Sequence, residues 1–162
     1  MIMKNKMFIL CLVLMALAMC LFSCGNDTPA NETKEIDMEK MASDILSKEP
    51  FAEELVERKL DDLGQYGFIY GFEQTPEKVV SYIGGGATPQ DLLIIKASNP
   101  DDAKAIKTTL EAYRDKQISI YEPYAASEVP NLENAVIKAN GACVVYCVAK
   151  NDVSSTINEY FE

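Results

Sequence analysis

Apolar residues recur at every third or fourth position in two segments near the start of the folded part of the chain. In residues 38–46 this spacing puts the apolar side chains on one face of a helix that ends near Pro50. Residues 52–63 repeat the spacing and predict a second helix that stops by Gly64. The pattern therefore predicts that the domain begins with two amphipathic helices.

The spacing of apolar residues changes after these helices. Residues 66–72 are aromatic and interrupted by glycine, which favours an irregular strand or an extended connection. Two short aliphatic runs follow at residues 79–83 and 92–97, and they predict a pair of antiparallel strands. The glycine-rich segment 84–89 between them is interpreted as a loose hairpin loop.

The clearest helix signal in the chain begins at Asn99. This residue is a good N-cap, Pro100 suits the first helical position, and the two aspartates that follow complement the positive end of the helix dipole. Apolar residues then recur at helical spacing from Ala103 to about Glu122. We expect one long helix over this stretch.

The dipeptide Asn140-Gly141 lies between two strand-like runs, residues 135–139 and 142–149. Because Asn-Gly favours a tight type I′ turn, these runs predict a second hairpin. A two-residue loop at this dipeptide gives the following pairs: Ala139 with Ala142, Lys138 with Cys143, Ile137 with Val144, and Ala135 with Tyr146.

A last helix follows the second hairpin, and Asn151 or Asp152 would cap it. Together these elements predict an α+β fold. We expect a four-stranded, mostly antiparallel sheet made of two hairpins. Helices pack on this sheet, and the first two helices are additions at the N-terminal side of the domain.

The two faces of the predicted sheet differ in polarity. One face carries Leu93 and Ile95 and is wholly apolar, whereas the other mixes apolar residues with Lys96 and Lys138. This second face is too apolar for an ordinary wet surface. We expect the first two helices to cover it, with a second copy of the chain or a ligand as the alternatives.

Residues 1–23 have the anatomy of a signal peptide. A short start with Lys4 and Lys6 precedes sixteen uncharged, mostly apolar residues. A permanent transmembrane helix is the weaker interpretation, because it needs roughly 20 apolar residues.

The sequence Leu21-Phe22-Ser23-Cys24 resembles the bacterial lipobox, in which a small residue directly precedes a cysteine that receives diacylglycerol. Cys20 is a rival acceptor, but the bulky Met19 precedes it. A freely secreted protein with unmodified Cys24 is the alternative. The resemblance implies lipid on Cys24 at the outer face of the bacterial cytoplasmic membrane. The eleven residues after Cys24 include no large apolar residue, so we expect a flexible tether at residues 24–35 and a single domain at residues 36–162.

The chain is acidic, with a formal net charge of -10. Such a surface repels polyphosphate and anionic headgroups, so we expect no nucleic-acid partner. Attachment to the membrane must then come from the lipid on Cys24.

The five cysteines do not make a disulfide framework. Three precede the domain, which keeps only Cys143 and Cys147, and four strand residues separate their Cα atoms by roughly 13 Å, beyond the ~7 Å of a disulfide. Two interpretations remain. Cys143 and Cys147 are either inert buried thiols or the reactive thiols of a thiol-dependent enzyme or redox protein. A reactive thiol needs a positive neighbour, and only Lys138 lies opposite Cys143 in the predicted hairpin, so we favour the first interpretation.

Other catalytic chemistry finds little support in the residues. The chain contains no histidine, which removes the commonest general base, the Ser-His and Cys-His pairs and most zinc sites. Gly84-Gly85-Gly86 lacks the Gly-Lys-Ser/Thr that completes a phosphate-binding loop. Asp61-Asp62 and Asp101-Asp102 are neighbours that point in different directions on a helix. We expect no catalytic residues, no cofactor and no metal.

The function that these observations favour is a surface-tethered binding or interaction module. Its candidate binding face combines the aromatic segment with the lysines of the mixed sheet face, and comprises Tyr66, Phe68, Tyr70, Phe72, Lys96 and Lys138. Aromatic side chains at this density also suit a core. The expected partner is an envelope protein, a peptide or a glycan, and a homodimer is a further option.

Six short motifs are spread along the folded part of the chain: Tyr66-Gly67, Asp91-Leu92-Leu93-Ile94-Ile95-Lys96-Ala97, Asp102-Ala103, Tyr124, Leu132-Glu133-Asn134-Ala135-Val136 and Gly141. On these residues the stretch 38–160 resembles a family of small lipoproteins from Gram-positive, largely anaerobic bacteria, catalogued as domain of unknown function 4358. The Gln-Lys of that family stands reversed here as Lys116-Gln117. The resemblance implies export, lipid anchoring and a compact α+β domain, and it carries no activity, substrate or site.

Overall fold

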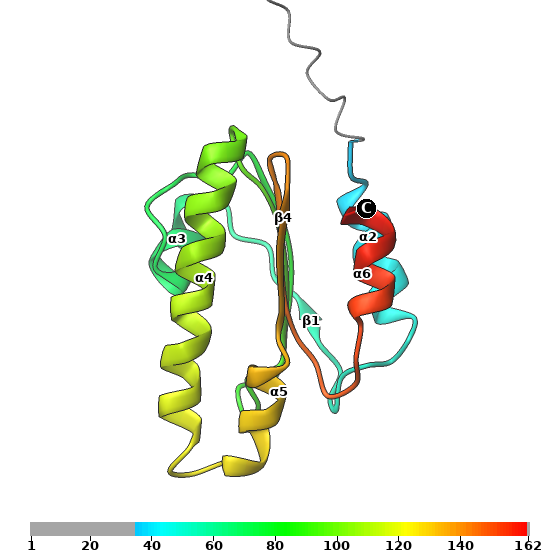
Figure 1. Cartoon of the computed structure of the whole chain (residues 1–162), viewed down its shortest axis with the longest axis vertical. Helices are drawn as coiled ribbons and strands as arrows, with labels where there is room; N and C mark the ends of the chain where they lie inside the picture. The colour runs from blue at the N-terminus through cyan, green and yellow to red at the C-terminus, as the bar shows by residue number, and fades with distance from the viewer. Residues whose placement is uncertain (1–34, 162) are drawn as a thin grey trace, which may run out of the picture. The chain divides into compact units, whose positions relative to one another are not determined.

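The computed structural model describes residues 35–161, in which helices pack on both faces of an antiparallel sheet (Figure 1). The predicted signal peptide, Cys24 and all of the predicted tether except residue 35 lie outside the described residues. In chain order the elements are α2 (Met38–Leu46), β1 (Val56–Glu57), α3 (Gly64–Tyr70), β2 (Lys78–Ile83), β3 (Asp91–Lys96), α4 (Pro100–Tyr121), the 3₁₀ helix η1 (Ala126–Glu128), α5 (Val129–Glu133), β4 (Val136–Asn140), β5 (Cys143–Val148) and α6 (Ser154–Phe161).

The sheet has five strands in the order β1-β2-β3-β5-β4, and every neighbouring pair is antiparallel. The α+β class and the antiparallel sheet are confirmed, but the predicted number of four strands is wrong. The additional strand, β1, has two residues that pair with the outer edge of β2, Val56 opposite Ile83. So short a strand has no period that a sequence pattern could reveal.

The prediction of a helix over residues 52–63 is also wrong. The chain there forms bends and β1, with the Arg58 N–H donating to the Ser81 carbonyl at 2.8 Å. The Arg58 carbonyl in turn accepts a hydrogen bond from the Tyr66 hydroxyl at 2.8 Å. Backbone pairing at the edge of the sheet thus replaces the helical hydrogen bonds, and tertiary context overrides the local spacing.

The prediction of an irregular strand or an extended connection at residues 66–72 is wrong, because residues 66–70 lie in helix α3. Gly71 ends this helix in the left-handed conformation with φ 92°, and its N–H donates to the Gly67 carbonyl at 2.6 Å. Because residues four apart share one helix face, Tyr66 and Tyr70 point the same way, and both are buried.

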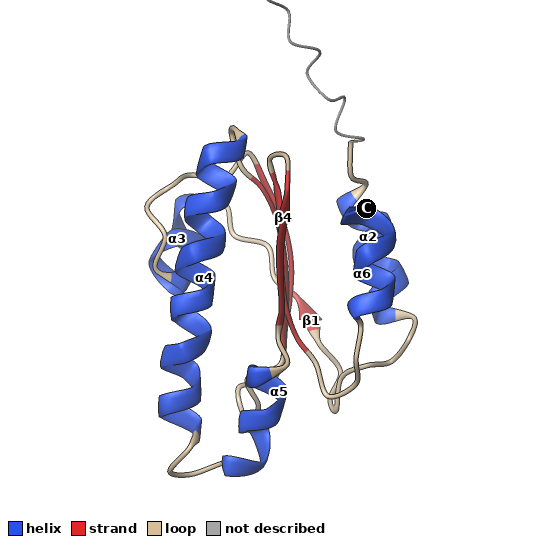
Figure 2. Ribbon diagram, in the orientation of Figure 1, coloured by secondary structure: helices blue, strands red, loops and turns tan. Residues whose placement is uncertain are grey.

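Alternating side chains of the central strands contribute to two hydrophobic cores, one on each face of the sheet (Figure 2). On the first face Leu93 and Ile95 belong to a core that also takes in α3, α4 and α5. On the second face Leu92 and Ile94 pack in a core with α2 and α6. Coverage of the second face by helices of the chain itself is confirmed, but α6 takes the place of the predicted second helix.

The hairpin of β4 and β5 turns one residue later than predicted. Asn140 pairs with Cys143, which leaves Gly141 and Ala142 as the loop, and Gly141 adopts a φ of 55°. Each strand residue therefore has a partner two positions away from the predicted one. Because two is an even number, every side chain still lies on the predicted face of the sheet.

The long helix α4 begins where the cap signal placed it. Asn99 Oδ1 accepts hydrogen bonds from the N–H groups of Asp101 and Asp102, at 3.0 and 2.9 Å. At the start of α6, Asp152 Oδ1 accepts from the Ser154 N–H at 2.8 Å, as expected for a cap at this position. These side chains satisfy helix N–H groups that otherwise have no partner.

The substitution Gly67→Ala tests the close contact between α3 and the chain that follows it. A Cβ at Gly67 would lie 2.3 Å from the carbonyl oxygen of Phe72, whereas a Cβ at Gly64 would meet only the Asp62 side chain, at 3.1 Å. We expect Gly67→Ala to lower the free energy of unfolding by about 1–3 kcal/mol, because the clash is with backbone at the edge of the core. Urea unfolding measures the loss, and Gly64→Ala on the same helix is the control. Equal, small losses in both variants would contradict the contact.

Candidate functional site

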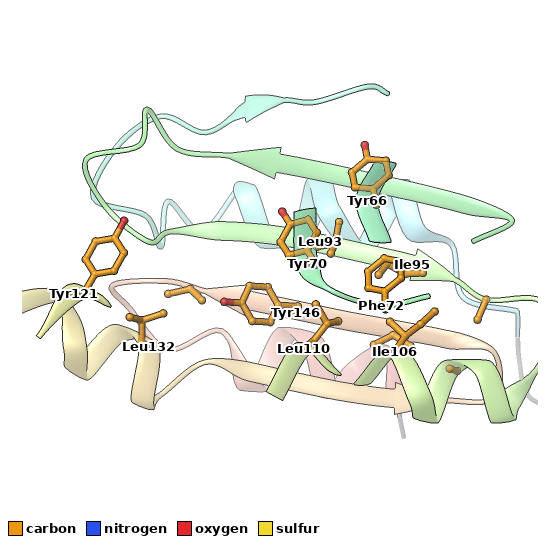
Figure 3. Packing of buried hydrophobic residues seen from close by; sticks show 14 residues of the cluster. Tyr66, Tyr70, Phe72, Leu93, Ile95, Ile106, Leu110, Tyr121, Leu132 and Tyr146 are labelled. Atoms are coloured by element: carbon orange, nitrogen blue, oxygen red, sulfur yellow. The ribbon is translucent and has the colours of Figure 1, made fainter. Parts of the chain in front are cut away.

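The aromatic residues of the predicted binding face do not share a surface. Tyr66, Tyr70 and Phe72 are buried in the first core (Figure 3), whereas Phe68 is 92% exposed. Helix α3 causes this separation, because Phe68 projects from the opposite side of the helix to Tyr66 and Tyr70. Only one ring of the predicted set is therefore exposed to a partner.

The two lysines of the predicted face are engaged by their own chain. Lys96 Nζ lies 3.3 Å from Glu35 Oε1 and 4.0 Å from Glu77 Oε2. Lys138 Nζ donates to Asn158 Oδ1 on α6. The sheet face that carries these lysines is the one that α2 and α6 cover, so the six predicted residues do not form one binding surface.

Cys143 and Cys147 lie on the same covered face, and both are buried. Burial raises the pKa of Cys143 to about 12, although the charge of Lys96 acts in the opposite direction. Burial, followed by the charge of Asp91, also raises the pKa of Cys147. Lys96, not the predicted Lys138, pairs with Cys143. Protonated and inaccessible thiols are poor nucleophiles, so this environment weighs against thiol chemistry.

A buried carboxyl group lies at the start of β3 on the first face of the sheet. The Tyr70 hydroxyl donates a hydrogen bond of 2.5 Å to Asp91 Oδ2. Asp91 as a residue is partly exposed, but its Oδ1 atom is inaccessible to water and has no hydrogen-bond partner within the described residues. A buried acceptor without a donor is costly, which makes Oδ1 the most conspicuous polar atom in this core.

The environment of Asp91 disfavours its negative charge. Loss of hydration raises the pKa of its carboxyl group from 3.8 to about 7, while the Tyr70 hydrogen bond, the charge of Arg58 and the nearby backbone N–H of Leu92 lower it. Burial, followed by the charge of Asp91, raises the pKa of Tyr70 well above its ordinary value. The hydroxyl of Tyr70 is therefore the proton donor in this pair, and Asp91 is the group that titrates near neutral pH.

Three tyrosine rings from different elements pack beside Asp91: Tyr70 of α3, Tyr113 of α4 and Tyr146 of β5. Their centroids are 5.1, 6.0 and 6.3 Å apart, and each pair meets edge to face. Burial and, next, the charge of Asp91 raise the pKa of both Tyr113 and Tyr146. These shifts place the carboxyl group close to the aromatic cluster.

A cavity of about 150 Å³ opens next to this cluster. It is lined by the segment from Ile83 to Asp91, by Tyr113, Gln117 and Tyr121 of α4, and by Tyr146 of β5. The described lining includes one carboxyl group and no lysine or arginine. The cavity thus combines aromatic rings, neutral amides and a single acid.

The loop at the mouth of this cavity is held by the preceding segment of the chain. Glu53 Oε2 accepts from the Gly85 N–H at 2.9 Å, and Glu53 Oε1 accepts from the Thr88 hydroxyl. Gln90 Oε1 accepts from the Ala52 N–H at 2.7 Å. The glycine-rich segment connects β2 to β3 as the predicted hairpin loop, but these hydrogen bonds make it less loose than expected.

Sequence reasoning missed this site. Its residues come from β3, α4 and β5, which are far apart in the chain, and no local motif joins them. One signal was present, because Asp91 precedes Leu93 and Ile95 at strand spacing and so lies on the apolar face. An acid in that row is unusual enough to mark a site.

The described structure holds further cavities. A larger polar cavity of about 430 Å³ lies beside α5 and the start of α6, near Asn131, Asn134 and Asn151. Among residues 35–161, His, Cys, Asp and Glu side chains do not gather in a group that could hold a metal ion. The helices of this same stretch are all too short or too polar to cross a membrane.

Comparison with known proteins yields one match. A family model described as "Domain of unknown function (DUF4358)" matches residues 68–149, which is half of the chain and contains Asp91, the three clustered tyrosines and Gln117. No curated protein and no solved structure matches the chain.

The raised pKa of Asp91 predicts a pH-dependent effect of Asp91→Asn on stability. Between about pH 4 and pH 7 the folded protein binds the Asp91 proton more tightly than the unfolded chain, so stability from this group falls as the pH rises through that window. We expect Asp91→Asn to be more stable than the parent above about pH 7, by at most about 4 kcal/mol. Below about pH 4 the two should be equally stable.

Urea unfolding of both proteins over this pH range measures the difference. Taking the difference removes the contributions of acids with lowered pKa values, such as Glu53 and Asp152, which favour the folded state at higher pH. The control is Asp61→Asn, at an exposed aspartate. A stability difference that does not change with pH would show that the Asp91 carboxyl group is not desolvated.

Proposed function

The chain belongs to the family described as domain of unknown function 4358, and from its anchor signal and its cavity we propose that it is a ligand-binding module. Lipid on Cys24 would hold the module at the outer face of the bacterial cytoplasmic membrane. The ligand would be a small molecule in the cavity beside Asp91, rather than a protein, peptide or glycan bound on an open sheet face.

The anchor rests on the sequence. A basic start, an apolar run too short for a transmembrane helix and Leu21-Phe22-Ser23-Cys24 favour export and lipid attachment. Each buried methylene group of an acyl chain contributes about 0.8 kcal/mol, so two long chains suffice to retain an acidic domain at a membrane. The resemblance to Gram-positive lipoproteins points in the same direction.

The binding role rests on one observation, which is the unpaired Oδ1 of Asp91 beside a cavity. A carboxyl group in this position costs stability, as its raised pKa reflects. Proteins keep such groups where they contact a ligand, because the ligand supplies the missing partner. The binding interpretation is also consistent with a chain that has no histidine.

The environment of the two thiols does not favour the alternative of a thiol-dependent enzyme. Cys143 and Cys147 are buried beneath α2 and α6, and the pKa of each is raised. Cys147 borders the larger cavity of about 430 Å³ together with Lys150, but it is only 1% exposed, and a buried, protonated thiol is a poor nucleophile.

Substitution of Cys24 tests the anchor. We expect the native protein in its host membrane fraction to begin at a diacylated Cys24, as measured by mass spectrometry. In the variant Cys24→Ser the precursor should remain uncleaved and without lipid, because the sulfur atom that receives the lipid is gone. Cys20→Ser is the matched control and should leave lipidation unchanged. Lipid on Cys20, or an unmodified Cys24 in the native protein, would contradict the anchor.

Closure of the cavity tests the binding role. Gln117→Trp places an indole ring at the lining of the cavity, and Lys116→Trp places the same ring on the exposed side of α4. A set of small fragments that includes cationic, neutral and anionic members is screened against the full chain by ligand-observed NMR. We expect fragments that bind the parent and Lys116→Trp to lose binding to Gln117→Trp. If no fragment of any charge binds, or if Gln117→Trp binds all of them unchanged, the proposal fails.

A further inference from the structure

The cavity beside Asp91 has the chemistry of a cation site. The ionisable side chains in its described lining are Asp91, Tyr113, Tyr121 and Tyr146. An anion placed there would face the carboxyl group without any lysine or arginine in the described lining to offset the repulsion. The net charge of -10 on the whole chain also raises the local concentration of cations rather than anions.

The aromatic lining favours an organic cation. Tyr113, Tyr121 and Tyr146 each contribute to the wall, and the face of a tyrosine ring attracts a cation that lies within about 6 Å of its centroid. The same rings provide apolar surface for an attached alkyl chain. A bare metal ion would instead require several oxygen ligands, and the lining offers one carboxyl group.

The unpaired Oδ1 of Asp91 specifies the kind of cation. Oδ2 already accepts from Tyr70, so Oδ1 is the carboxyl oxygen left without a partner, and a ligand N–H reaches it only once the side chains that cover it move. A primary ammonium group donates N–H bonds and carries the charge that offsets the desolvated carboxylate, whereas a quaternary ammonium group has no N–H to donate. Because Oδ1 lies behind the surface of the cavity, the donor must be slender and must displace the side chains that cover it.

We infer that the cavity binds a small primary alkylammonium group, with its nitrogen hydrogen-bonded to Asp91 Oδ1 and its alkyl portion against Tyr113, Tyr121 and Tyr146. This inference rests on the proposed binding function and adds the chemical class of the ligand. The volume of about 150 Å³ admits a group of roughly six non-hydrogen atoms.

Four probes of similar size separate charge from shape: n-butylammonium, tetramethylammonium, n-butanol and butyrate. Each is titrated into the full chain in non-ionic detergent at constant ionic strength and about pH 8, where ionised Asp91 predominates. The NMR signals of tyrosine rings carrying a carbon-13 label report binding at the cavity. We expect n-butylammonium to bind at least about tenfold more tightly than any of the other three probes.

Asp91→Asn preserves the size of the side chain and its ability to accept from Tyr70, but removes the charge. We expect it to weaken n-butylammonium binding by about tenfold or more, while the control Asp61→Asn at an exposed site leaves binding unchanged. Gln117→Trp, which leaves Asp91 intact, should also abolish the tyrosine shifts. These two variants alter the charge and the space separately, so misfolding of one does not remove the test.

The outcomes distinguish the ligand class from the proposed function. If n-butanol or butyrate binds as tightly as n-butylammonium, or if Asp91→Asn binds it unchanged, the inference about the ammonium group is overturned while the binding cavity stands. If tetramethylammonium binds most tightly, the rings rather than Oδ1 select the ligand, and the inference also fails. If none of the four shifts a tyrosine signal and the wider fragment set is equally silent, the proposed function itself falls.

Discussion

Burial of the central strands on both faces is the constraint on which the rest of this structure depends. Every residue of β5 is buried, as are Leu92 to Ile95 of β3. The side chains on both faces of these inner strands are therefore shielded from water. A sheet that is apolar on both faces must have a layer of helices on each side. The chain provides α3, α4 and α5 for one face and α2 and α6 for the other. The shorter strand β1 and the partly exposed β4 then lie at the edges, where incomplete burial costs least.

Asp91 is an exception within this apolar arrangement, and its position explains how the fold tolerates it. It is the first residue of β3, so it lies at the rim of the core, where a cavity reaches it, rather than in the middle. Asp91 has one structural role, because its hydrogen bond with Tyr70 ties α3 to the sheet. An asparagine would accept the same hydrogen bond without the cost of desolvating a charge, which raises the pKa of Asp91 to about 7. The charge itself is therefore the feature that a structural role leaves unexplained.

The sequence correctly predicted the elements that have a long apolar period or a specific cap or turn residue. The cap at Asn99, the stripe of α2 and the two hairpins follow from local chemistry, and alternation assigned the residues of β3, β4 and β5 to the correct faces. The sequence did not predict the short elements β1 and α3. Residues 52–72 take their conformation from contacts with the sheet edge and α4 rather than from the spacing of their own apolar residues. The cavity beside Asp91 was not predicted for the same reason, because Asp91, Tyr113 and Tyr146 become neighbours only when β3, α4 and β5 pack together.

The direction of β3 connects the cavity with the proposed anchor. Asp91 and Lys96 are its two ends, and five strand residues separate them by roughly 16 Å. Glu35, the first described residue and the one where the tether would join, lies 3.3 Å from Lys96 and hence at the end of the strand remote from Asp91. A lipid on Cys24 would therefore hold the domain by the end of β3 that lies away from the cavity. The residue where the tether would join and the cavity thus lie at opposite ends of β3.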